Sequence, residues 1–339
     1  MSLVHMAKIH TIHTYVTRGK ITESIHNSKC LIKDYNFKTI FSTNNDDDLI
    51  YPRSSIKIFQ AIPFINSEAY REFNLTKKQI AISCSSHCGE IEHIKVLKQW
   101  IKKIKINKNI LKCGIHNPID KKSSDKLLLS GNKPDVLHNN CAGKHLGMIS
   151  GCIANNMSIN NYLEINHPYQ KLIRESLEFF TESKISKTQK GVDGCSAPQY
   201  AFSLTNLCTA IINLLKESNN NGKYNKETNI LLDSIAKYPN LTGSKSIYPS
   251  QLMNITKGRV FAKVGAEGVL IFANRDSKVG GVIKVEDGNE RALPSVANKI
   301  FQKLDILNKN ELLKLSNWTN EKIFNHAKIQ VGKIYTKVK

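Results

Sequence analysis

The sequence predicts an α+β protein with one mainly antiparallel sheet built from both ends of the chain. Two runs near the N-terminus, residues 9–16 and 30–41, are rich in β-branched and aromatic residues, with turn-forming Asn27 and Ser28 between them. The same composition returns at 269–273, 279–285 and 331–335. Helical spacing dominates the middle of the chain, so we expect helices that flank the sheet and a helical region beside it.

Helices are expected where apolar residues recur every three or four positions. The expected helices are 91–106, one or two within 160–187, 199–215, 227–237 and one within 287–307. A short apolar run at 79–83 is interpreted as a strand. Residues 125–131 are expected to form a loop and 238–258 to be irregular.

Length and charge limit the class of protein. A chain of 339 residues fits one or two domains, and we expect one, over residues 1–339. The net charge of +21 comes from lysines spread along the whole chain, and no nucleic-acid-binding module is recognisable. The most basic segment, 98–108, fits the solvated face of an amphipathic helix better than a binding patch. We therefore expect no nucleic-acid partner.

The cysteines and the apolar runs indicate a compartment. Eight cysteines occur in a chain whose N-terminus lacks the apolar core of a leader peptide, so reduced thiols and a cytoplasmic location are expected. No apolar run approaches the roughly 18 residues that a membrane-spanning helix needs, so we expect no membrane insertion.

Ser54 and Lys57 form a pattern typical of an activated serine. A serine and a lysine three residues apart on a helix lie on one face, where the neutral amine can accept the hydroxyl proton. Pro52 disfavours helix before it, and Ser54 is expected to be the N-cap of a helix that Pro63 kinks. The alternative interpretation is a helix cap followed by a surface lysine, because Ser-x-x-Lys is common by chance.

Three other stretches concentrate polar side chains among small residues. They are the turn at 85–90, the segment 137–148 with Cys141, Lys144 and His145, and the loop 191–198 with Cys195. Small residues let a backbone approach a ligand closely, which an active-site turn requires. The alternative for 137–148 is a helix N-terminus capped by asparagine with a buried, unreactive thiol.

Five motifs together resemble the L-asparaginase II family of the rhizobial type. Its members carry Pro-Arg-Ser-x-x-Lys, Ser-His-x-Gly-Glu, Asn-Cys-x-Gly-Lys-His, Asp-Gly-Cys and Lys-x-Gly-Ala-Glu-Gly, in that order. All five occur here, at 52–57, 86–90, 140–145, 193–195 and 263–268. The resemblance extends from about residue 14 to 335, although 216–260 matches poorly.

The resemblance implies an amidohydrolase that converts L-asparagine to L-aspartate and ammonia. It implies a fold similar to the serine β-lactamases and serine-type glutaminases, a single catalytic domain and a homodimer. Two serine-lysine pairs would perform the reaction, Ser54 with Lys57 and Ser86 with Lys263. The residue types leave open which serine is the nucleophile.

The resemblance also implies a zinc site and a substrate site. Cys141, Lys144 and Cys195 would hold the zinc ion. From ligand chemistry alone, His138 or His145 would be a more usual third ligand than a lysine. The residues implied to bind the substrate are Arg53, His145, Asp193, Gly265 and Glu267.

Two other functions stay open from the sequence. One is a different serine-lysine amidohydrolase, acting on glutamine or on a β-lactam-like amide. The other is a zinc- or nucleic-acid-binding protein without catalysis. Release of ammonia from asparagine separates the enzymes from the binding protein, and a comparison of asparagine with glutamine separates the enzymes from each other.

Overall fold

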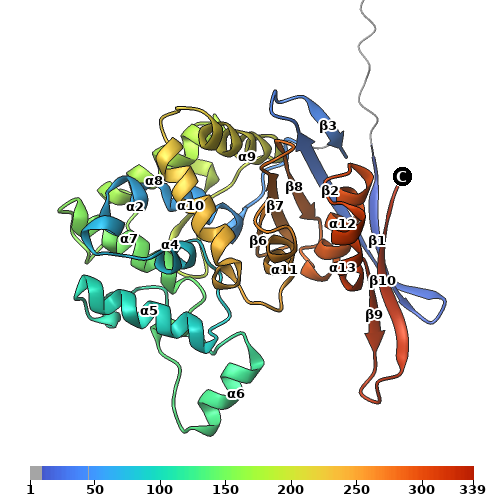
Figure 1. Ribbon diagram of the computed structural model, residues 1–339, viewed down its shortest axis with the longest axis horizontal. Helices are drawn as coiled ribbons and strands as arrows, with labels where there is room; N and C mark the ends of the chain where they lie inside the picture. The colour runs from blue at the N-terminus through green and yellow to red at the C-terminus, as the bar shows by residue number, and fades with distance from the viewer. Residues whose placement is uncertain (1–9, 45) are drawn as a thin grey trace, which may run out of the picture. The chain divides into compact units, whose positions relative to one another are not determined.

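A computed structural model describes residues 10–44 and 46–339 (Figure 1). These residues form two compact units, each assembled from separate stretches of chain. Unit 1 contains the described part of Met1–Ser55 together with Phe202–Leu215 and Ile255–Lys339. Unit 2 contains Ile56–Ala201 and Lys216–Asn254. That the whole chain acts as one domain stays a prediction.

Unit 1 is built on an eight-stranded antiparallel sheet, in the order β6-β7-β8-β2-β1-β10-β9 with β3 paired to β2 (Figure 1). The strands are β1 (Ile12–Arg18), β2 (Ile21–Lys33), β3 (Thr39–Ser42), β6 (Val260–Gly265), β7 (Val269–Asn274), β8 (Val279–Val285), β9 (Asn320–Phe324) and β10 (Gln330–Val338). Because β1 pairs with β10 and β2 pairs with β8, both ends of the chain build the sheet. This confirms the predicted α+β fold class.

Helices cover both faces of this sheet. The helical elements of unit 1 are α9 (Leu204–Asn219, in unit 1 as far as Leu215), α12 (Leu293–Lys303), α13 (Lys309–Lys314), α14 (Ser316–Thr319), η1 (Arg53–Ile56, in unit 1 as far as Ser55) and η6 (Glu290–Ala292). A Cβ on Gly280 would lie 2.4 Å from the Ile211 side chain of α9. The next residue, Gly281, pairs with Phe272, whose ring contacts Phe301 of α12. Since successive residues of a strand face opposite ways, α9 and α12 lie on opposite faces.

Unit 2 is mainly helical. It contains α1 (Lys57–Gln60), α2 (Ile62–Asn66), α3 (Ala69–Glu72), α4 (Lys77–Ser83), α5 (Ile91–Ile104), η2 (Lys108–Ile110), α6 (Lys121–Leu129), η3 (Val136–His138), α7 (Ala142–Ala154), α8 (Pro168–Thr181), η4 (Lys187–Gln189), α10 (Asn225–Lys237), η5 (Pro239–Thr242) and α11 (Tyr248–Ile255), with a two-stranded ribbon of β4 (Lys190–Val192) and β5 (Pro198–Tyr200). This unit is the predicted helical region.

Helix α7 is buried over most of its length. A Cβ on Gly143 would lie 2.1 Å from the Ile82 carbonyl oxygen of α4, and a Cβ on Gly147 would lie 3.4 Å from the Ser83 side chain. Glycine at position 143 therefore lets α7 lie directly against the backbone of α4, whereas the contact at position 147 is an ordinary one. The close approach fixes the start of α7 relative to the segment that follows α4.

Three local predictions are wrong. Residues 79–83 belong to helix α4, because Thr76 and Gln79 form a capping box and a short apolar run fits either structure. Residues 125–129 belong to α6, which Asp120 caps by accepting a hydrogen bond from the Ser123 backbone N–H. Part of 238–258 forms η5 and α11.

The helix expected to begin at Ser54 is also different. A 3₁₀ turn, η1, covers Arg53–Ile56, and α1 and α2 follow with a break at Ala61, two residues before Pro63. No side chain caps α1, so Ser54 is not an N-cap. Residue 9, the first of the predicted strand region 9–16, lies outside the described residues. Within the described residues, no helix is long and apolar enough to cross a membrane.

Candidate active site

Lys57, the first residue of α1, is a lysine with a buried amine. Its side chain is about 1% exposed. The Lys57 Nζ lies 3.0 Å from Ser86 Oγ and 3.2 Å from Cys141 Sγ, and it donates to the Ser85 carbonyl oxygen. A lysine in contact with a serine hydroxyl can exchange a proton with it, which is the contact that serine-lysine catalysis requires.

Backbone hydrogen bonds fix the segment that carries Ser86. After α4 ends, the Ser86 N–H donates to the Thr242 carbonyl oxygen at 3.0 Å and the Cys88 N–H donates to Gly243 at 3.1 Å. Between them the His87 N–H donates to the Asn140 carbonyl oxygen at 3.2 Å. The backbone of the segment that carries Ser86 is therefore held by segments far away in the sequence.

Cys141, directly before α7, is positioned by the asparagine that precedes it by two residues. Asn139 accepts a hydrogen bond from the Cys141 backbone N–H at 2.9 Å and donates from Nδ2 to the Cys113 carbonyl oxygen at 2.7 Å. Asn139 is buried, so its amide orients the thiol of Cys141 from within the unit.

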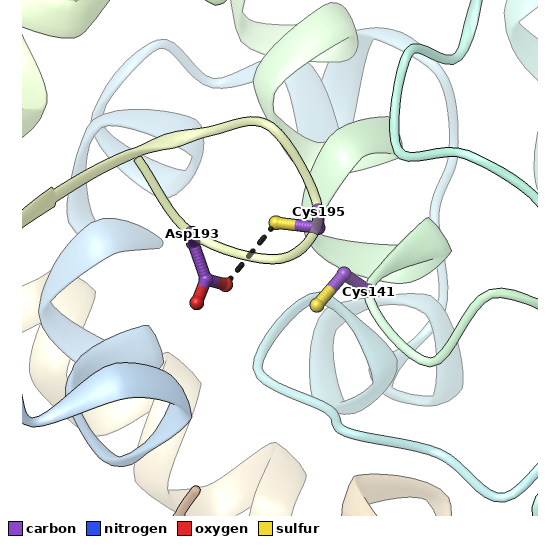
Figure 2. A group of neighbouring side chains, drawn as sticks. All are labelled: Cys141, Asp193 and Cys195. Atoms are coloured by element: carbon purple, nitrogen blue, oxygen red, sulfur yellow. Dashed lines mark hydrogen bonds between the residues drawn. The ribbon is translucent and has the colours of Figure 1, made fainter. Parts of the chain in front are cut away.

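Cys141, Asp193 and Cys195 form a buried group that could hold a metal ion (Figure 2). Their ligand atoms all lie within 4.8 Å of one another. Asp193 and Cys195 stand in the tight loop between β4 and β5, where the Asp193 N–H donates to Ala197 and Ser196 adopts a left-handed φ of 68°. The Cys195 thiol lies 3.3 Å from Asp193 Oδ2.

Lys144 of α7 joins this group. Its Nζ lies 3.0 Å from Cys195 Sγ and 4.0 Å from Asp193 Oδ2. Burial lowers the pKa of the Lys144 amine, but the negative charges of the Cys195 thiolate and the Asp193 carboxylate outweigh burial and raise the pKa above its ordinary value. Without a metal ion, Lys144 is therefore an ammonium group that neutralises a buried anion.

The two thiols have opposite protonation preferences. A hydrogen bond from Cys141, with Lys144 beside it, lowers the pKa of Cys195 to about 5 despite burial. Donating that hydrogen bond, together with burial, raises the pKa of Cys141 to about 12. At neutral pH one thiolate, one thiol and one ammonium share the site, and a divalent metal ion would displace the remaining protons.

The donor set fits zinc. Two cysteine sulfurs with a carboxylate or a nitrogen are ligands that zinc prefers, and Cys141 and Cys195 are common to the predicted set and the observed group. The third ligand differs, since the ligand group contains Asp193, whereas the sequence resemblance implies Lys144. Lys144 would have to lose its proton to coordinate. His138, the more usual type of third zinc ligand, is not in this group, and its Nδ1 lies 3.0 Å from Asp135 Oδ1.

His145 lies next to Lys144 and is fully buried. Burial, with Lys144 beside it, lowers the pKa of His145 to about 3, so the imidazole is neutral. Its Nδ1 lies 2.7 Å from the Tyr162 hydroxyl, and its Nε2 has no hydrogen-bond partner among the described residues. The neutral ring thus has one polar atom left for a ligand.

The candidate residues of unit 1 lie on neighbouring segments of that unit. A Cβ on Gly265 would lie 2.1 Å from the Pro52 carbonyl oxygen and 3.0 Å from the Ser55 nitrogen, so the end of β6 lies against the turn that contains Arg53 and Ser54. Arg53 adopts a left-handed φ of 51°. Such a conformation is costly for a non-glycine residue and is frequent at functional sites.

Lys263 of β6 is buried, and its Nζ donates to the Val264 carbonyl oxygen at 3.1 Å. Glu267 follows in the β6–β7 turn with a φ of 63°. A Cβ on Gly288 would lie 2.5 Å from Glu267 Oε2, so glycine at 288 leaves room for that carboxylate.

The predicted site residues thus divide between the two units. Unit 2 brings together Lys57, Ser86, Cys141, Lys144, His145, Asp193 and Cys195. Unit 1 carries Arg53, Ser54, Lys263, Gly265 and Glu267. Sequence reasoning missed Asn139 and Tyr162. Asn139 precedes Cys141 by two residues, which is a recognisable capping signal, whereas no local signal marks Tyr162.

The predicted basic face of helix α5 lines a groove on the surface of unit 2. Lys95, Lys98 and Lys102 of α5 line a groove of about 900 Å³ together with residues of α6 and the loop after it. Exposed lysines with few acidic neighbours are expected in a chain of this charge. The absence of a nucleic-acid partner stays a prediction.

A buried histidine beside Ser86 should make stability depend on pH. Burial, with His93 stacked against it, lowers the pKa of His87 well below the ordinary value of 6.5. The unfolded chain therefore binds a proton below about pH 6.5 that the folded chain does not. Stability should be constant above that pH and fall as pH decreases below it, by up to about 1.4 kcal/mol per pH unit for this group.

Urea unfolding between pH 5 and 8 measures the effect. His87→Asn can still accept the Gly89 N–H that His87 Nδ1 accepts at 3.2 Å, but it cannot titrate, so its stability should depend less on pH than that of the wild type. His326→Asn, at an exposed position, is the control. Equal pH dependence in His87→Asn and wild type would contradict the assignment.

The fold and the site define a class. Within the helical unit, a buried lysine contacts a serine hydroxyl beside a cysteine-rich group that could hold a metal ion, which is a set of residues able to perform hydrolysis. The L-asparaginase II family model matches residues 14–336, and the chain belongs to this family. It is therefore an amidohydrolase of the asparaginase type, and its substrate is a small molecule, asparagine.

Other comparisons add little. A solved chain from Bacteroides dorei DSM 17855, provisionally named a beta-lactamase, is similar over 81% of this chain and 92% of its own length, with 10% sequence identity and a TM-score of 0.43. This level of similarity leaves the β-lactamase-like fold a prediction. No curated protein has a significant match to this chain.

Proposed function

We propose that this protein hydrolyses the side-chain amide of L-asparagine by serine-lysine catalysis, with a zinc ion bound beside the serine-lysine group. The observation that carries the proposal is the 3.0 Å contact between Lys57 Nζ and Ser86 Oγ in a buried setting. The contact places the Lys57 amine where it can exchange a proton with the serine hydroxyl, which is what a proton acceptor for that serine requires.

The reaction needs a nucleophile and two proton transfers. A serine hydroxyl attacks the carboxamide carbon while a lysine takes its proton, and the same proton then passes to the departing nitrogen, which leaves as ammonia. Water hydrolyses the resulting serine ester to aspartate and restores the hydroxyl. The family resemblance implies the pairs Ser54 with Lys57 and Ser86 with Lys263, whereas the observed contact joins Lys57 to Ser86. We assign these four residues to the proton transfers, and either serine is a candidate nucleophile.

Charge complementarity supports the substrate roles. The guanidinium of Arg53 can hold the α-carboxylate by two parallel hydrogen bonds, and the carboxylate of Asp193 can pair with the α-ammonium group. His145 can donate or accept one hydrogen bond through its unpartnered Nε2. The Gly265 backbone and the Glu267 side chain complete the proposed substrate site.

Zinc would be held by Cys141, Lys144 and Cys195, with Asp193 as an alternative to Lys144. When bound, zinc supplies a positive charge that can orient substrate groups. In its absence Lys144 supplies positive charge at the same place, since its Nζ contacts Cys195 and approaches Asp193. We therefore propose that the ion shapes the substrate pocket, while the serines and lysines carry the chemistry.

The zinc assignment predicts a specific defect for Cys195→Ala. With one of two sulfur ligands gone, the purified variant should contain little zinc and have a raised KM, while kcat stays measurable. Cys152→Ala, a buried thiol of the same helix as Lys144, is the matched control and should retain its zinc. Metal analysis and steady-state kinetics measure both effects.

Two outcomes would count against this assignment. Wild-type protein without stoichiometric zinc would remove the metal site. A zinc-free Cys195→Ala protein whose kcat is as low as that of Ser54→Ala would instead make the ion catalytic.

We further propose a cytoplasmic location and a homodimer. All eight cysteines are free and buried, which supports a reducing compartment. The homodimer rests on the family resemblance, and we also propose that the two units act together as a single catalytic domain.

Ammonia release tests the proposed reaction. Purified protein should release ammonia from L-asparagine with a kcat/KM well above that for L-glutamine. Faster turnover of glutamine, or of a β-lactam, would replace the proposed substrate within serine-lysine chemistry. Release from none of these amides would favour a binding protein without catalysis.

A further inference from the structure

Tyr162 connects His145 to the backbone of another segment. Both side chains are fully buried in unit 2. The Tyr162 hydroxyl lies 2.7 Å from His145 Nδ1 and accepts a hydrogen bond from the Lys112 backbone N–H at 2.9 Å. The two rings meet edge to face with centroids 5.6 Å apart.

Counting donors and acceptors fixes the direction of the hydrogen bond between the two side chains. If His145 Nδ1 donated, the Tyr162 hydroxyl would accept from both His145 and Lys112, and its own proton would have no partner. The lone pair on His145 Nε2 would also have no donor, so two groups would be unpartnered. If the Tyr162 hydroxyl donates to Nδ1, its proton is used and only the Nε2–H group of His145 stays unpartnered. Buried polar groups strongly favour the arrangement with fewer unpartnered atoms.

Tyr162 is held firmly enough to enforce this arrangement. Its carbonyl oxygen accepts a hydrogen bond from Gln170 Nε2 at 2.8 Å, and the Lys112 N–H fixes its hydroxyl. A backbone N–H can only donate, so the hydroxyl proton has to point away from Lys112 and is available to His145.

We propose that Tyr162 is a positioning residue that holds His145 in the tautomer protonated on Nε2, so that His145 presents one N–H donor to an oxygen atom of the substrate. This rests on the proposed function, in which His145 binds the substrate. An N–H donor selects a carboxylate or carbonyl oxygen and disfavours an ammonium group. Together with Asp193, which attracts the ammonium group, it would distinguish the two ends of an amino acid.

Tyr162→Phe removes the hydroxyl and keeps the ring. Histidine ¹⁵N NMR should show protonation on Nε2 in the wild type, and both tautomers of His145 in Tyr162→Phe. The KM for asparagine should rise by about two- to tenfold, the effect of one weakened neutral hydrogen bond, with kcat within about twofold. Tyr169→Phe is the matched control, because the Tyr169 hydroxyl is buried and has no hydrogen-bond partner among the described residues.

Two variants of His145 test the donor itself. Glutamine can place an N–H near the position of Nε2, whereas the shorter asparagine can place one only near Nδ1. His145→Gln should therefore keep a lower KM than His145→Asn. The reverse order would contradict the inference.

The NMR result separates this inference from the proposed function. Protonation on Nδ1 in the wild type, or an unchanged tautomer and KM in Tyr162→Phe, would overturn the role of Tyr162. A wild-type protein with the Nε2 tautomer that does not hydrolyse asparagine would support that role and overturn the proposed function.

Discussion

Replacing Lys57 with methionine is expected to lower kcat for asparagine hydrolysis by about 10²- to 10⁴-fold, the usual contribution of a positioned proton acceptor. The Lys57 amine directly contacts a serine hydroxyl, at 3.0 Å from Ser86 Oγ, and Lys57 follows Ser54 by three residues. Methionine preserves the length and the apolar part of the buried side chain, so the fold should tolerate it. Steady-state kinetics with a circular-dichroism melt measure both properties.

Lys57→Arg is the control for charge. Arginine keeps a positive charge but does not lose its proton in proteins, so it cannot act as the base. Both variants should be inactive if Lys57 transfers protons. A loss of less than about tenfold in Lys57→Met, in a folded protein, would give Lys57 a structural role.

Ser54→Ala is expected to abolish asparagine hydrolysis and to leave the fold intact. Ser54 is half-buried in η1, and we assign it the hydroxyl that exchanges a proton with Lys57. Loss of a nucleophile or of its proton relay removes the covalent route altogether, so the decrease in kcat should be as large as that of Lys57→Met or larger.

The next residue provides a matched control. Ser55 is fully buried, and its hydroxyl donates to the Pro52 carbonyl oxygen at 2.7 Å. Ser55→Ala should therefore cost about 1 kcal/mol of stability, the net effect of one hydrogen bond, with little change in kcat. Full activity in Ser54→Ala, or an equal loss of kcat in Ser55→Ala, would show that Ser54 has no special chemical role.

The sheet could be predicted because its strands carry local signals. Val269–Asn274 and Val279–Val285 are apolar, β-branched runs bounded by turn residues, and the pairing of chain ends follows once strands are expected at both termini. The strand predicted at 79–83 is wrong because four or five apolar residues fit a helix, here α4, as well as a strand. The deciding signal was the capping box at Thr76, three residues before Gln79.

The site residues could be nominated from their motifs, but their contacts could not. Lys57 meets Ser86 because Ser86 is held by Thr242 and its neighbours, which follow it by more than 150 residues. The approach of Cys141 to Cys195 likewise depends on how α7 packs and on the turn after β4. Such tertiary contacts leave no local pattern, and Tyr162 illustrates this most clearly.

Partitioning of the reaction with hydroxylamine tests serine catalysis most directly. A serine ester forms after ammonia has left, so hydroxylamine can attack the ester in place of water and yield aspartate β-hydroxamate. Serine-lysine catalysis predicts hydroxamate that replaces aspartate as hydroxylamine increases, with an undiminished rate of ammonia release, and neither product in Ser54→Ala. Wild-type protein that releases ammonia and forms only aspartate at every hydroxylamine concentration would contradict it.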